Sequence, residues 1–185
     1  MLDVTKKIEK IIDDIFKIEG GYSDHSSDSG GKTRFGITEE VARSFGFRGN
    51  MKGLPESMAR HIYKTRYITS VGFDMVVSID PEIGLEIIDT GVNMGSVTAA
   101  MFLQRWLNGF NSKNKYSELF VDGRIGSVSI SALHGFLDWR GEAGKEALLN
   151  GLNCTQGCRY LDITENNKSQ RDFLFGWISQ RVSRK

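Results

Sequence analysis

The sequence predicts an all-α fold with a small β-hairpin, and three observations carry this prediction. Apolar residues recur at helical spacing over most of the 185 residues. The chain holds 21 glycines but only 2 prolines, which is typical of helices joined by tight glycine turns. Residues 22–37 are the exception, because they are polar and rich in Gly, Ser and Asp. They predict a loop or a small hairpin with its turn at residues 29–31.

The first helix is predicted over residues 4–19, and it ends on a carboxylate that lies on the apolar side. Two glycines follow this helix and can end it. Glu19 follows Ile12 by seven residues and Ile15 by four, so it shares a helix face with these apolar side chains. A carboxylate that faces the core is unusual, and it makes Glu19 a candidate functional residue.

Helix-starting signals mark the central part of the chain. Asp80, Pro81 and Glu82 combine an N-cap, a proline at the first helical position and an acid in the first turn. The helix that they begin is apolar around most of its circumference and is expected to be central in the fold. The other predicted elements are helices over residues 38–45, 55–68, 96–108, 128–139, 142–163 and 169–183, and a short hairpin at Asp122–Gly123 within a loop over residues 109–127.

The charge balance excludes a general nucleic-acid binder. Lys and Arg total 24 and Asp and Glu total 23, for a net charge of +1, whereas such binders carry a clear basic excess. No apolar run approaches the roughly 18–20 residues needed to span a bilayer. The N-terminal residues are charged throughout and lack the apolar region of a signal peptide. We therefore expect a monomer that is made in the cytoplasm and does not insert stably into a membrane.

The cysteines and tryptophans favour packing over chemistry. Cys154 and Cys158 lie four residues apart with no histidine nearby, so packed thiols are expected rather than a metal site. No metal or cofactor is expected elsewhere. Trp106, Trp139 and Trp177 each fit a helical period, which favours core packing over contact with carbohydrate.

Glu19, Asp28 and Thr33 form the pattern that indicates catalysis. Cleavage of a glycosidic bond needs one carboxylic acid that stays protonated, and a second polar group that orients water or stabilises the developing cation. Apolar surroundings raise the pKa of a carboxyl group, so Glu19 fits the acid, and Asp28 in a polar loop fits the ionised partner. The alternative is that Glu19 is a solvated residue at a helix end and that the other two are ordinary turn residues.

The same region resembles glycoside hydrolase family 108, the N-acetylmuramidases of the lysozyme superfamily. The resemblance rests on Ile18–Tyr22 (IEGGY), Asp28–Thr33 (DSGGKT) and Phe35–Thr38 (FGIT). It continues through Asp89–Gly95 (DTGVNMG), and Val121–Gly126 (VDGRIG) is similar to the start of the family's C-terminal peptidoglycan-binding module. The match extends over nearly the whole chain.

This resemblance implies a lysozyme-like helical bundle that cleaves the β-1,4 bond between N-acetylmuramic acid and N-acetylglucosamine. It implies a catalytic part over residues 1–95 and a helical peptidoglycan-binding part over residues 96–185. Glu19 matches the family's catalytic glutamate, and the order Glu19, Asp28 and Thr33 resembles the catalytic triad of phage-type lysozymes. The substrate is bacterial peptidoglycan, reached in the periplasm after release, either in phage lysis, as an endolysin, or in local wall opening for protein or toxin secretion.

Three further residues are candidate contacts to the sugar chain: Tyr22, Asp89 and Asn93. Tyr22 could stack on a sugar ring or pack as a half-buried aromatic. Asp89 and Asn93 form a narrow polar stripe with Glu86, and the stripe faces either water or a cleft. Two other functions stay open at this point, namely a lytic transglycosylase and a protein that binds peptidoglycan without cutting it.

Overall fold

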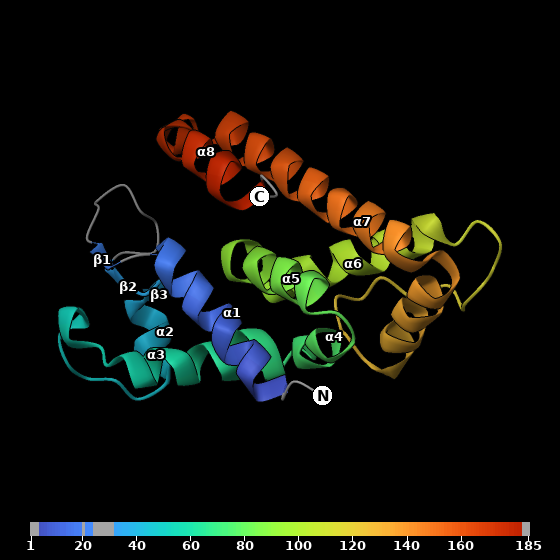
Figure 1. Cartoon of the computed structure of the whole chain (residues 1–185). Helices are drawn as coiled ribbons and strands as arrows, with labels where there is room; N and C mark the ends of the chain where they lie inside the picture. Colours follow the sequence, from blue (N-terminus) through green and yellow to red (C-terminus); the bar gives the residue numbers. More distant parts are fainter. Residues whose placement is uncertain (1–3, 20, 24–31, 183–185) are drawn as a thin grey trace. The chain divides into compact units, whose positions relative to one another are not determined.

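The computed structural model describes residues 4–19, 21–23 and 32–182, with the backbone alone at Val4, Lys7, Ile11, Ile18, Glu19 and Gln180. The chain divides into two compact units, Met1–Ser70 and Val71–Lys185. Both are built mainly of helices, and the first also contains a small antiparallel sheet (Figure 1). The predicted all-α fold with a small β element is therefore confirmed.

The first unit places short helices around a three-stranded sheet in the order β1-β2-β3. Its second strand pairs antiparallel with both others, so the structure contains one more pairing than the single predicted hairpin. The predicted turn at residues 29–31 lies outside the described residues. The elements are α1 (Val4–Glu19), β1 (Tyr22–Ser23), β2 (Thr33–Arg34), β3 (Ile37–Thr38), α2 (Glu39–Ser44), the 3₁₀ turn η1 (Met51–Gly53), α3 (Glu56–Ile62) and the π-helix η2 (Tyr63–Thr69).

Two helix starts in this unit follow from local sequence. Thr38 caps α2, because its Oγ1 accepts a hydrogen bond from the backbone N–H of Val41 at 3.3 Å. Pro55 is the N-cap of α3 rather than its first helical residue. The prediction of one α-helix over residues 55–68 is only partly right, since the chain changes to π-helical geometry at Tyr63.

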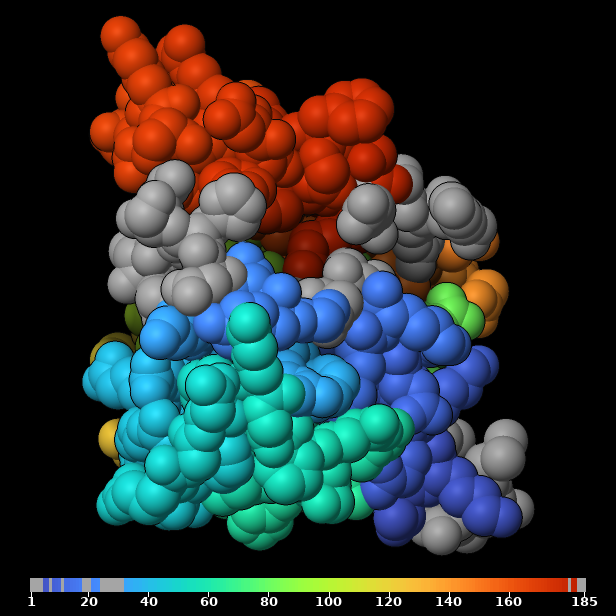
Figure 2. All heavy atoms as spheres, turned by 90° about the vertical axis from the view of Figure 1, so that its left-hand side faces the viewer, coloured from blue at the N-terminus to red at the C-terminus, as the bar shows by residue number. Residues whose placement is uncertain are grey.

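An ion-pair network fastens α1 to α3 and η2. Ile12 and Ile15 are fully buried on one face of α1. On its polar face, Arg60 of α3 donates to Glu9 at 3.1 Å and also pairs with Asp13. Lys64 of η2 pairs with Glu9 as well. Figure 2 shows α1, in blue, directly beside the cyan and teal atoms of the segments that supply these cations.

The second unit is a bundle of helices in which α5, α6 and α7 pack on one another. The short helix α4 also packs on α5, and this helix was missed in the sequence. Gly84 permits the close approach, because a Cβ there would lie 2.5 Å from Cγ2 of Val77. The elements are α4 (Phe73–Ile79), α5 (Pro81–Met94), α6 (Ser96–Phe110), α7 (Ser127–Asn166), the 3₁₀ turn η3 (Lys168–Gln170), α8 (Arg171–Trp177) and the π-helix η4 (Ile178–Val182).

A sharp bend interrupts α7 at Gly141. The backbone of this residue has φ 59° and ψ −149°, outside helical values, so α7 consists of two helical segments (Figure 1). The predicted pair of helices over residues 128–139 and 142–163 is thereby confirmed. The cap of α5 is confirmed as well, since Oδ1 of Asp80 accepts hydrogen bonds from Glu82 N at 2.9 Å and Ile83 N at 3.0 Å.

The expected hairpin at Asp122–Gly123 is wrong, because residues 111–126 form a loop without strands. The buried side chain of Gln104 holds this loop instead. Its Nε2 donates to Oδ1 of Asp122 at 2.9 Å, and its Oε1 accepts from the backbone N–H of Gly123 at 2.9 Å. Side-chain hydrogen bonds therefore replace the ladder that a hairpin would supply.

Two remaining findings concern the surface. Cys154 and Cys158 are free and exposed, so the expectation of packed thiols is wrong. Their face of α7 points away from the neighbouring helices, which the four-residue spacing alone did not indicate. Across the part of the chain that the structure describes, no helix combines the length and the apolar character needed to cross a membrane.

Candidate active site

The first candidate residue, Glu19, is the last residue of α1. In the chain, Glu19 therefore lies three residues before Tyr22, where β1 begins. The Glu19 side chain and the whole of Asp28 lie outside the described residues. Their catalytic roles consequently remain predictions, and the described surroundings define the frame in which they would act.

Thr33 lies in the central strand of the sheet. It faces Ser23 of β1 on one side and Thr38 of β3 on the other, and it is half-buried. The strand then turns sharply, because Phe35 has φ 53° and Gly36 has φ 70°. A positive φ is costly for a residue with a side chain, so this turn needs support from its surroundings.

Tyr63 supplies that support from the π-helix. Its side chain is fully buried, and its hydroxyl donates a hydrogen bond to the backbone carbonyl of Phe35 at 2.8 Å. The ring of Phe35 also stacks on Phe16 of α1, with centroids 4.9 Å apart. A π-helical turn is rare and is frequently found at functional sites.

One aromatic cluster thus connects the elements that carry two candidate residues. Phe16 contacts both Phe35 and Tyr63, with a centroid distance of 5.5 Å to the latter. It lies one turn before Glu19 on α1, whereas Phe35 lies two residues after Thr33. The cluster therefore fixes the end of α1 relative to the β2–β3 turn. The sequence did not predict this cluster, because its members come from elements that are distant in the chain.

Tyr67 extends this cluster. Its ring centroid lies 5.4 Å from that of Tyr63, and burial raises the pKa of its hydroxyl, a shift that the charge of Arg66 partly offsets. The hydroxyl therefore remains protonated at neutral pH and can donate a hydrogen bond.

Tyr22 is half-buried in β1, with a cation near its ring. The Nζ atom of Lys52 lies 5.1 Å from the ring centroid, within the range of a cation–π interaction. Stacking of this ring on a sugar stays a prediction.

The polar stripe on α5 belongs to the second unit. Oδ1 of Asp89 accepts from Nη1 of Arg181 at 2.6 Å, and its Oδ2 accepts from Nε2 of Gln156 at 3.1 Å. Glu86 accepts from Nδ2 of Asn153 at 3.0 Å. The stripe was predicted to face water or a cleft, but at Glu86 and Asp89 it faces α7 and η4.

Asn93 is the exposed member of the stripe. Its Nδ2 donates to the backbone carbonyl of Asp89 at 2.8 Å, which leaves its side-chain oxygen available to a ligand. Within the described ranges, no group of three or more His, Cys, Asp or Glu residues is arranged to hold a metal ion.

Two family models match successive parts of the chain. Residues 12–95 match the model described as glycosyl hydrolase 108, and residues 98–182 match the model described as a predicted peptidoglycan domain. The first match contains the end of α1, the sheet, the aromatic cluster and α5. The second contains most of α6 and all of α7, α8 and η4.

Comparison with solved structures shows a similar fold. SagA of Brucella abortus is similar in fold, with a TM-score of 0.71 and 24% sequence identity over 96% of this chain and 90% of that chain. No curated protein matches the sequence. From the two family models, residues 12–95 form a glycoside hydrolase family 108 domain and residues 98–182 form a peptidoglycan domain, so the chain is a peptidoglycan hydrolase in which the glycosidase domain precedes the peptidoglycan domain.

Proposed function

We propose that the protein is an N-acetylmuramidase that cleaves the β-1,4 bond between N-acetylmuramic acid and N-acetylglucosamine. The observation that carries this proposal is the family match over residues 12–95, which includes both the helix end at Glu19 and the strand with Thr33. The contacts of Phe16 with Phe35 and Tyr63 support it, because a catalytic acid and its partners need fixed relative positions.

In the proposed mechanism, Glu19 is the general acid. It protonates the glycosidic oxygen as the bond breaks through an oxocarbenium-like transition state. Asp28 and Thr33 orient the attacking water or stabilise the developing cation. Thr33 is half-buried in the central strand, where it pairs with Ser23 and Thr38.

The substrate contacts are proposed on the same basis. Tyr22 and Asn93 bind the glycan through an aromatic ring and an amide oxygen, respectively. Asp89 contributes in addition to its pairing with Arg181 and Gln156. In this proposal, residues 1–95 carry the reaction and residues 96–185 hold peptidoglycan.

The proposed setting is the periplasm, where a monomer reaches peptidoglycan after release from the cytoplasm. The same bond cleavage serves bacteriolysis by a phage or local wall opening for secretion. Export of the protein to the periplasm of a host cell distinguishes these settings. A lytic enzyme lowers the turbidity of the culture, whereas an enzyme that opens the wall locally leaves the turbidity unchanged.

Mass spectrometry of the products tests the proposed reaction. Purified sacculi are digested with the wild-type protein, and the released muropeptides are reduced and weighed. Hydrolysis at the proposed bond gives reducing muramic acid ends. A lytic transglycosylase would instead give 1,6-anhydro ends, which are lighter by the mass of one water before reduction and take up no hydrogen on reduction. Products with reducing glucosamine ends would contradict the assigned bond.

A further inference from the structure

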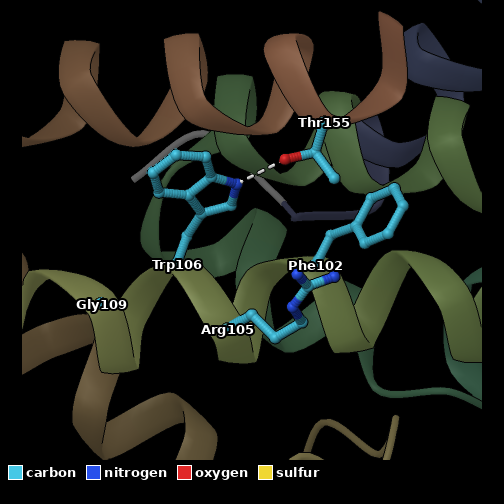
Figure 3. Close-up of a pocket in the computed structure, with 5 residues that line it drawn as sticks. All are labelled: Phe102, Arg105, Trp106, Gly109 and Thr155. Atoms are coloured by element: carbon cyan, nitrogen blue, oxygen red, sulfur yellow. Dashed lines mark hydrogen bonds between the residues drawn. The ribbon is translucent and has the colours of Figure 1, made fainter. Parts of the chain in front are cut away.

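A pocket lies between α6 and α7 in the second unit, and none of its lining residues is among the catalytic or sugar-contacting candidates named above. Its volume is about 210 Å³, and it opens to solvent. Figure 3 shows Phe102, Arg105 and Trp106 on α6 with Thr155 of α7 above them. Its lining residues on α6 recur at helical spacing, so one face of that helix forms most of the wall: Phe102, Arg105, Trp106 and Gly109.

Trp106 is fixed in place before any ligand enters. Its Nε1 donates to Oγ1 of Thr155 at 2.9 Å, and that hydroxyl donates in turn to the carbonyl of Gly151 at 3.0 Å. The indole lies against Gly151, where a Cβ would come within 2.7 Å of the ring. Phe110 stacks on the indole with centroids 5.4 Å apart. A rigid aromatic wall binds ligands at low entropic cost.

Arg105 brings a positive charge to this apolar wall. It is exposed, and among the described residues its guanidinium group has neither a carboxylate partner nor a hydrogen-bond acceptor. This contrasts with Arg60 and Arg181, which pair with carboxylates. A guanidinium group beside aromatic rings is well suited to bind a carboxylate in a bidentate manner.

The size of the pocket limits the ligand to a small group. At about 210 Å³ it is below the range of roughly 300–1,000 Å³ that is usual for drug-sized ligands. Phe102 and Trp106 offer an apolar surface, and Arg105 offers one charge. A small group that carries one carboxylate and one methyl group complements this lining.

We propose that this pocket binds such a group of peptidoglycan, with the carboxylate on Arg105 and the methyl group between Phe102 and Trp106. The inference rests on the proposed function, because it assumes that the wall is the substrate. Two parts of the wall share this chemistry, namely the D-lactyl ether of N-acetylmuramic acid, when no peptide is attached, and the terminal D-alanine of a stem peptide. The pocket thereby holds the wall at a position separate from the bond that is cut.

Nuclear magnetic resonance titration of the full chain tests the proposal. Free N-acetylmuramic acid presents the lactyl group, and the peptide L-Ala-D-Glu-Lys-D-Ala presents the terminal alanine. Neither probe contains the bond that the enzyme cleaves. We expect shifts of the Trp106 indole N–H with at least one probe, and the stronger probe identifies the source. N-acetylglucosamine and inorganic phosphate should cause no such shift, because the first lacks the charge and the second lacks the methyl group.

Three variants locate the site. Arg105→Gln should weaken binding by about tenfold or more, since it removes a charge-assisted hydrogen bond. Arg171→Gln is the matched control, because Arg171 is exposed on α8 and is not part of the pocket wall. Gly109→Leu should block the pocket without disturbing the fold, because a Cβ at this position meets no heavy atom within 4 Å.

The outcomes separate this inference from the proposed function. Equal affinity of Arg105→Gln and wild type, or equal shifts with phosphate, would overturn the assigned ligand. Absence of Trp106 shifts with both carboxylate probes would overturn it as well, even if the protein still cleaves sacculi. Conversely, binding that depends on Arg105 in a protein that releases no muropeptides would support the pocket and contradict the proposed reaction.

Discussion

Arg181 forms a nearly buried ion pair with Asp89, and this pair joins η4 to α5. Nη1 of Arg181 lies 2.6 Å from Oδ1 of Asp89, and the two side chains are 8% and 14% exposed. Gln156 of α7 donates to the other carboxylate oxygen. The last described turn of the chain is therefore fastened to the helix that carries two candidate substrate contacts.

Loss of this pair should destabilise the protein strongly. Arg181→Gln leaves the Asp89 charge in a site with little access to water, so we expect a loss of roughly 3 kcal/mol in the free energy of unfolding. Urea unfolding followed by circular dichroism measures this change. Arg159→Gln is the matched control, because its pair with Asp162 spans 3.9 Å at the surface and should contribute less than about 1 kcal/mol. Equal losses in the two variants would show that burial of the pair has no effect.

The hydroxyl of Tyr63 should matter for both stability and activity. Tyr63→Phe keeps the ring but removes the donor to Phe35, whose part-buried carbonyl then lacks that hydrogen bond. We expect a loss of about 1–2 kcal/mol in stability and a reduced kcat, because the β2–β3 turn follows Thr33 directly. Tyr67→Phe provides the comparison, since the Tyr67 hydroxyl makes no hydrogen bond among the described residues. An unchanged kcat in Tyr63→Phe would refute a role of this turn in positioning Thr33.

Two helical glycines beside Trp106 should respond to alanine in opposite directions. At Gly109 a Cβ meets open space, so Gly109→Ala should stabilise α6 by about 0.5–1 kcal/mol. At Gly151 a Cβ would lie 2.7 Å from the Trp106 ring, so Gly151→Ala should destabilise the protein by about 1–3 kcal/mol. Thermal unfolding of both variants measures the difference. A stabilising Gly151→Ala would mean that the indole moves freely, contrary to the fixed wall described above.

Stability should fall at acidic pH through Glu9. The hydrogen bond from Lys64 holds the pKa of this carboxyl below its ordinary value of 4.5, an effect that Arg60 reinforces and partial burial opposes. Because the pKa is lower in the folded state, the contribution is fully present above pH 4.5 and is lost as the pH falls through the lowered value. Thermal midpoints between pH 7 and pH 3 should decline less in Glu9→Gln than in wild type. Parallel declines would exclude Glu9 as a source of the acid sensitivity.

Local sequence signals predicted the elements that local chemistry determines. The cap at Asp80 followed by Pro81 located the start of α5, and two helices were predicted on either side of the bend that the structure places at Gly141. The β2–β3 turn was missed because Phe35 is not a typical residue for positive φ. Its stability comes from Tyr63, which lies 28 residues away in sequence.

The arrangement of the candidate sites depends on contacts between residues that are distant in the chain, and no local sequence pattern reveals such contacts. The polar stripe on α5 was visible in the sequence, but its partners Gln156 and Arg181 are distant in the chain. Trp106 was expected to pack in the core, and the structure places it in the wall of an open pocket because Thr155 and Gly151 of α7 lie beside it. The helix face on which a residue lies can be predicted from periodicity. The residues that it contacts can be identified only from the tertiary fold.

Hydrolysis of purified sacculi by wild type and Glu19→Gln, side by side, tests the central claim most directly. The substitution keeps the size of the side chain and removes the acid, so circular dichroism should be unchanged. We expect release of muropeptides to fall by at least about 10²-fold, as for loss of a general acid. Comparable release by the two proteins, both folded, would contradict the assignment of Glu19 as the catalytic acid.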